Sequence, residues 1–189
     1  MFRRYIVPLS WMLVCSVWIF SCKKEKDDPK LQNESEIITT FHYYLNPVGG
    51  GTSAVFTFRD LDGEGGKPPE IITDSLASNK VYQGQVILLN EQKNPPDTIS
   101  KEVLTEGTKH QLFYQPSVAG LSVQYQDTDA DRNPIGLITK LTTGSAANGI
   151  LRVTLRHEPN KSAAGVVAGD ITNAGGETDI EVSFNVTVR

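Results

Sequence analysis

The last ten residues of the chain constrain its fold most, because their side chains alternate strictly between apolar and polar. The apolar positions are Ile180, Val182, Phe184, Val186 and Val188, and the polar positions are Glu181, Ser183, Asn185, Thr187 and Arg189. Successive side chains of a strand point to opposite faces, so this pattern predicts an antiparallel strand with one buried face. Such a strand is stable only in a sheet whose apolar face packs against another layer.

The rest of the chain predicts further strands and almost no helix, because turn-forming residues interrupt it at short intervals. The expected strands are 37–45, 52–59, 71–73, 81–90, 111–115, 121–126, 136–142, 149–156 and 180–189. Residues 98–103 fit one helical turn, and 159–176 form a long loop of small residues. The sequence therefore predicts one all-β domain over 36–189, an antiparallel two-layer sandwich of immunoglobulin-like Greek-key type, with a β-barrel as the alternative.

The N-terminus predicts export and lipid attachment. Two arginines, Arg3 and Arg4, precede an apolar run over 5–20, which is short for a membrane-spanning helix and typical of a signal peptide. The run ends in Ile19-Phe20-Ser21-Cys22, which resembles the bacterial lipobox. The resemblance implies that residues 1–21 are removed and that Cys22 carries fatty acyl chains such as palmitate, which anchor the protein in a membrane.

Residues 22–35 form a charged tether that cannot bury a core. Within it, Lys26-Asp27-Asp28 resembles the signal that sends Bacteroidetes lipoproteins to the cell surface. We therefore expect a lipid-anchored protein of the outer membrane, on the external face of the cell.

Charge and cysteine content exclude several functions. The chain has 22 acidic and 18 basic residues and no long basic run, so nucleic acid is not an expected partner. Its two cysteines are Cys15, in the signal peptide, and Cys22, the acylation site. The mature domain therefore has no thiol for a disulfide, a metal site or a nucleophile.

One predicted loop has a calcium-like spacing. Its oxygen-bearing residues occupy alternate positions: Asp127, Asp129, Asp131 and Asn133. Arg132 and Ile138 stand where an EF-hand needs glycine and glutamate, so only a looser calcium site is predicted, to which Asp60, Asp62 and Glu64 of another loop would contribute. The alternative is that these side chains only shape turns.

The chain has three histidines, and they are the candidates for a zinc or copper site. His110 and His157 are the first expected ligands, with Glu158 or His42 completing the set. The zinc-protease helix motif is absent, because Pro159 follows Glu158 and Lys161 occupies the position of the second histidine. The alternative is three isolated histidines at strand ends.

Catalytic residues are not predicted. No nucleophile elbow is present, and nothing selects a pair of carboxylates for glycoside hydrolysis. We therefore expect a binding protein and not an enzyme, with a hydrolase as the least favoured function.

Four stretches resemble an uncharacterised family of Bacteroidetes outer-membrane lipoproteins. They are 57–63 (TFRDLDG), 125–130 (YQDTDA), 155–161 (LRHEPNK) and 169–179 (GDITNAGGETD). Members are often catalogued as type 1 periplasmic binding fold proteins, a name that implies two α/β lobes, whereas this strand-rich chain predicts a β sandwich. The resemblance implies an accessory role beside a TonB-dependent receptor.

The leading hypothesis from the sequence is a lipid-anchored module that captures a metal ion or small nutrient at the cell envelope. The second hypothesis is a structural or adhesive surface domain whose acidic loops are stiffened by calcium.

Overall fold

The computed structural model describes residues 37–63 and 65–189. The predicted signal peptide (1–21), the predicted acylation site Cys22, the expected tether (22–35) and Glu64 lie outside the described residues. Within the described residues the chain forms nine strands, one α-helix and three short 3₁₀ helices. None of the described helices is long and apolar enough to cross a membrane.

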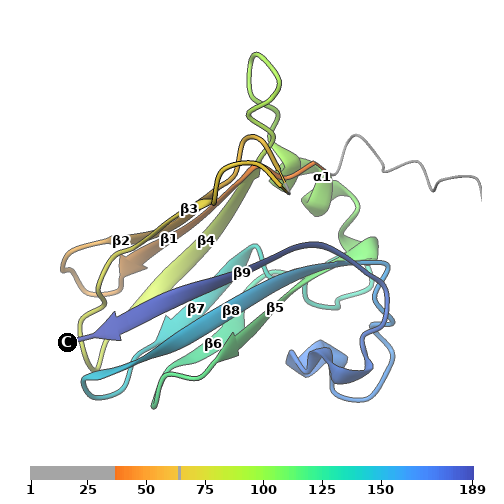
Figure 1. The fold of residues 1–189 in the computed structure, drawn as a ribbon. Coiled ribbons are helices and arrows are strands. Elements are labelled where there is room, and N and C mark those ends of the chain that lie inside the picture. Colours follow the sequence, from red (N-terminus) through yellow and green to blue (C-terminus); the bar gives the residue numbers. More distant parts are fainter. Residues whose placement is uncertain (1–36, 64) are drawn as a thin grey trace, which may run out of the picture. The chain divides into compact units, whose positions relative to one another are not determined.

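Six strands form one antiparallel sheet in the order β3-β2-β1-β4-β7-β6 (Figure 1). Their bounds are β1 Thr40–Pro47, β2 Ala54–Arg59, β3 Glu70–Thr73, β4 Val81–Leu89, β6 Ser122–Tyr125 and β7 Ile138–Thr142. In β1 the buried residues Phe41, Tyr43 and Leu45 alternate with His42 and Tyr44, which are more exposed. This alternation gives the sheet one core face and one outer face.

The second sheet has three antiparallel strands in the order β5-β8-β9. They are β5 His110–Pro116, β8 Ala147–His157 and β9 Glu177–Val188. In β9 every second residue from Ile180 to Val188 is buried, and the residues between them are exposed. The strand predicted from the closing alternation is confirmed.

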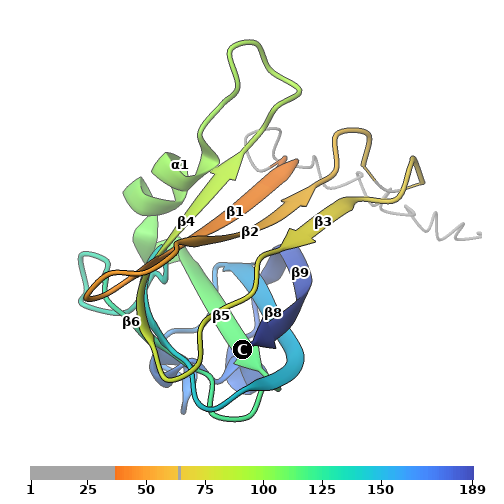
Figure 2. The same ribbon diagram turned by 90° about the vertical axis from the view of Figure 1, so that its left-hand side faces the viewer.

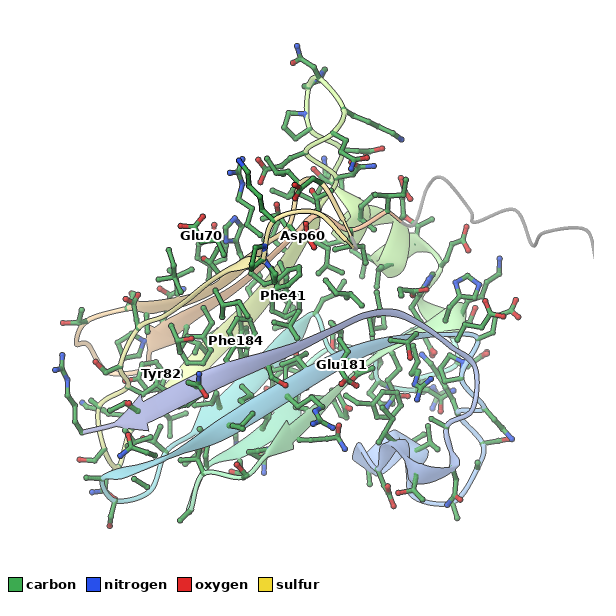
Figure 3. All side chains as sticks on the ribbon, in the orientation of Figure 1. Phe41, Asp60, Glu70, Tyr82, Glu181 and Phe184 are labelled. Carbon is green, nitrogen blue, oxygen red and sulfur yellow. The ribbon has the colours of Figure 1, made fainter. Side chains whose placement is uncertain are left out.

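The two sheets pack face to face (Figure 2), and the side chains of Phe41 and Phe184 lie between them (Figure 3). The ring of Phe184 in β9 lies 5.7 Å from that of Phe41 in β1 and 5.5 Å from that of Phe56 in β2. Tyr43 and Tyr114 make a similar contact between the sheets at 5.6 Å. The predicted two-layer β architecture is confirmed. The barrel alternative is wrong, because in the described residues each sheet ends in two edge strands.

Two connections flank the strands of the three-stranded sheet: one precedes β5, and the other joins β8 to β9. Helix α1 (Ile99–Thr105) and the 3₁₀ turn η2 (Gly107–Lys109) lead directly into β5. Residues 158–176, hereafter the β8–β9 loop, contain the short turns η3 (Val166–Ala168) and η4 (Ile171–Asn173). The helical turn expected at 98–103 is therefore confirmed as α1.

Candidate metal centre

His110 and His157 lie opposite each other at one end of the three-stranded sheet. His110 is the first residue of β5, His157 is the last of β8, and the two are register partners. Paired residues of an antiparallel ladder project from the same face. Their rings accordingly meet edge to face, with centroids 4.8 Å apart and an interplanar angle of 88°.

Asp179 joins the two histidines through an irregularity in β9. Leu155 pairs with Ile180 and Arg156 pairs with Thr178, so Asp179 is an extra residue between two consecutive pairs. Such a β-bulge redirects side chains and is common beside functional sites. Here it places the Asp179 carboxylate oxygen Oδ2 3.8 Å from Nε2 of His110. A regular strand would have pointed Asp179 away from the face of Ile180.

The three side chains form a group that could hold a metal ion. One ligand atom from each of His110, His157 and Asp179 lies within 4.8 Å of the other two. Ligand atoms of a tetrahedral zinc ion lie about 3.3 Å apart, given bonds of about 2.0 Å, so the longest separation in the group would shorten by up to about 1.5 Å around an ion. Two imidazoles and one carboxylate suit zinc or copper, whereas calcium prefers six to eight oxygens.

A backbone carbonyl orients one of the ligands. Nδ1 of His110 lies 3.2 Å from the carbonyl oxygen of Glu106. The carbonyl oxygen can only accept a hydrogen bond, so Nδ1 carries the proton in the neutral ring, and Nε2 is the nitrogen that faces Asp179. Histidine ligands of metals are commonly oriented in this way by their second nitrogen.

The group is open to solvent on one side. The side chains of His110 and Asp179 are 5% and 6% exposed, whereas that of His157 is 20% exposed. Glu158 lies at this open side, with its carboxylate oxygen Oε1 3.8 Å from Nε2 of His157 and its side chain 71% exposed. Of the two residues predicted to complete the site, Glu158 is thus beside the histidines, although outside the group of three.

His42 does not join the other histidines. It lies in β1 of the six-stranded sheet, where its Nδ1 is 3.0 Å from the hydroxyl oxygen of Thr57 and its ring contacts Tyr44. Partial burial lowers the pKa of His42, and the nearby charge of Arg59 adds to this effect while Glu91 opposes it. His42 is therefore placed in a separate polar environment on the other sheet.

The predicted calcium loop is occupied by a lysine of the same chain. The ammonium group of Lys161 donates to Oδ2 of Asp129 (2.8 Å) and to the carbonyl oxygens of Gly107 (2.6 Å) and Pro134 (2.9 Å). Both charged side chains are buried, at 6% and 1% exposure. Burial opposes ionisation of Asp129, but the hydrogen bonds from Lys161 and from the backbone of Asn133 outweigh it and lower its pKa.

Three further acidic side chains of the two loops, and the second carboxylate oxygen of Asp129, accept backbone hydrogen bonds. Asp127 accepts from the N–H groups of Gly136 and Ile138, and Oδ1 of Asp129 accepts from those of Asp131 and Asn133. Asp60 and Asp62 accept in the same way from Gly63 and Lys67. These contacts are those of turn-shaping residues. In the described part of the chain, only the histidine–aspartate group brings three potential His, Asp or Glu ligands together.

Asp179 is the site residue that the sequence pattern did not reveal. Strict alternation before Ile180 assigns it to the solvent face, and only the bulge reverses that assignment. A signal was nevertheless present, because the polar run Glu177-Thr178-Asp179 directly precedes the alternating segment and can accommodate a change of register.

No protein-family model, curated protein or solved structure matches this chain.

Proposed function

We propose that this domain binds a transition-metal ion, zinc or copper, through His110, His157 and Asp179. The observation that carries the proposal is the convergence of three ligand atoms within 4.8 Å at the end of one sheet. The orientation of His110 by the Glu106 carbonyl supports it, because histidine ligands of metals are commonly oriented through their second ring nitrogen in this way.

The open side at His157 favours reversible capture over permanent burial of the ion. Structural zinc sites are usually closed by four protein ligands, whereas catalytic zinc sites have three protein ligands and keep the fourth position open for water or substrate. We propose that an open position here serves exchange of the ion. That position would let a metal ion be exchanged with solvent or with a second protein. We infer a binding role and no catalysis.

The sequence adds a location to this proposal. An acylated Cys22 and the tether 22–35 would hold the domain at the outer membrane, on the cell surface. Metal captured there would pass to a transport protein, for which a TonB-dependent receptor is the proposed partner.

We further propose that the fold is a variant of the immunoglobulin-like Greek key. The order β3-β2-β1-β4 supports this assignment, because three hairpin-connected strands are followed by a fourth strand that lies beside the first.

Thermal unfolding of the full chain with added metal tests the binding proposal. Cys15 and Cys22 should both be replaced by serine, so that neither thiol competes for the ion. Zinc or copper at a hundredfold excess over the dissociation constant should raise the free energy of unfolding by about 2.7 kcal/mol. The metal-dependent increment should disappear in His110→Ala, His157→Ala and Asp179→Ala.

His42→Ala is the matched control, because it removes a histidine from the other sheet and should keep the full increment. The proposal fails if neither zinc nor copper stabilises the chain. It also fails if the increment survives in the three site variants.

A further inference from the structure

A cavity of about 260 Å³ lies at the end of the domain opposite to the histidines. It is lined by residues of the turn between β1 and β2, of the connection 74–80 between β3 and β4, of β4 itself, and by Arg189, which directly follows β9. This end of the molecule carries the C label in Figure 1. Asp179 and Arg189 are ten residues apart along β9, so the cavity is roughly 30 Å from the proposed metal site.

The floor of the cavity is apolar and held in place by hydrogen bonds. Leu76 forms a parallel bridge with β9, and the backbone N–H of Arg189 donates to the carbonyl of Leu76 at 2.9 Å. The side chains of Leu76 and Tyr82 are fully buried, and Figure 3 shows Tyr82 at this end of the sheets. The phenol oxygen of Tyr82 accepts a hydrogen bond from the N–H of Ala77 at 2.8 Å. The floor is therefore formed before any ligand arrives.

Both charged side chains that line the cavity are positive. They are the ammonium of Lys80 and the guanidinium of Arg189, and neither forms an ion pair with another described residue. Asp74, in the same connection, does not line the cavity, because its carboxylate accepts from the N–H of Val55 at 2.9 Å. A main-chain oxygen of Arg189 accepts from the N–H of Ser78 at 2.8 Å. The side-chain charge of the lining therefore favours an anion.

We propose that this cavity binds a small organic acid, with the carboxylate between Lys80 and Arg189 and the apolar part on Leu76 and Tyr82. The planar fork of an arginine matches the two oxygens of a carboxylate. An inorganic anion would leave the apolar floor uncovered. The volume lies just below the range of pockets for drug-sized ligands, so a small molecule is expected.

Hydroxyl groups at the cavity provide further donors for a carboxylate. The side chains of Thr52 and Ser75 line it, and neither hydroxyl makes a hydrogen bond to another described residue. The proposal does not depend on the metal site, because the two sites share no residue.

Titration of the full chain with benzoate, followed by amide NMR signals, tests the proposal. Benzoate carries both a carboxylate and an apolar ring, whereas phosphate has only the charge and benzyl alcohol only the ring. Benzoate should shift the signals of Gly51, Thr52 and Ala77 in a saturable manner, and less so at high salt. Phosphate and benzyl alcohol should each bind about tenfold more weakly, since each lacks one of the two contacts.

Absence of saturable benzoate shifts at these residues would overturn the proposal. Phosphate binding as tight as benzoate binding would overturn the organic-acid assignment, because the apolar floor would then contribute nothing. Either failure would leave the metal site untouched.

Charge variants test the assigned contacts. Lys80→Gln and Arg189→Gln should each weaken benzoate binding about tenfold, the expected loss of one charge-assisted hydrogen bond. Lys101→Gln removes an equal charge from the exposed surface of α1 and is the matched control, which should bind benzoate as the native chain does. Unchanged binding in both cavity variants would overturn the proposal. Equal weakening in Lys101→Gln would also overturn it, because it would indicate attraction by overall charge alone.

Discussion

Two polar clusters in this domain use neighbouring carbonyl groups, but only one of them contains a cation supplied by the chain. The carbonyl of Gly107 accepts from the Lys161 ammonium, and the carbonyl of Glu106 faces Nδ1 of His110. The lysine cluster is complete, because Asp129 and two carbonyls surround an ammonium supplied by the chain. The histidine cluster instead presents two imidazoles and a carboxylate with a side open to solvent.

This difference shows that a spacing of acidic residues can indicate a cation without indicating its source. The alternating loop 127–133 has the pattern of a calcium site, yet the Asp129 carboxylate binds Lys161, a residue from a distant loop. The histidine cluster has no sequence motif, because strand register and one bulge assemble it.

Removal of the lysine should have the largest effect on stability. Lys161→Met leaves the buried Asp129 carboxylate without its cation, and breaking a buried ion pair typically costs about 3–5 kcal/mol. Chemical denaturation should show a loss of that size. Lys101→Met, on the exposed surface of α1, is the control and should change stability by less than about 0.5 kcal/mol.

A double variant shows whether the loss is due to the unpaired charge. Lys161→Met combined with Asp129→Asn removes both charges while keeping an acceptor oxygen for the turn. It should be more stable than Lys161→Met alone, which a double-mutant cycle would reveal. Additive losses would mean that Lys161 and Asp129 do not interact, and would contradict the description of the lysine cluster as a buried ion pair.

Acid should weaken the lysine cluster by a smaller amount. The pKa of Asp129 is lowered in the folded protein, so its stabilising contribution is present above the ordinary aspartate pKa of about 3.9 and is lost as the pH falls through the lower folded value. The free energy of unfolding, measured from pH 5 downward, should therefore fall more steeply in the native chain than in Asp129→Asn. Equal slopes would contradict the assigned role of this carboxylate.

Calcium should have the smallest effect, because Lys161 already occupies the acidic loop. Addition of calcium should leave the midpoint of thermal unfolding unchanged in the chain with Cys15→Ser and Cys22→Ser. A calcium-dependent rise that disappears in Asp129→Asn would restore the alternative of a calcium-stiffened structural domain.

The sequence predicted the layers of the fold well, because hydrophobic alternation directly reports which face of a strand is buried. The segment from Ile180 to Val188 is the clearest case, and α1 was also located correctly. The pairing of His110 with His157 could not be derived, because it depends on which strands are neighbours and on their register. Lys161 was equally hidden, since long-range contacts of a loop leave no periodic pattern.

The bulge at Asp179 has a consequence for how such a site could arise or disappear. Deletion of one residue from the polar run 177–179 would restore a regular ladder while every apolar residue from Ile180 onward kept its partner in β8. Deletion of a single codon is therefore enough to change a strand that places the carboxylate beside the histidines into one that does not. Descendants of one ancestral domain could differ in metal affinity while their hydrophobic cores remained the same.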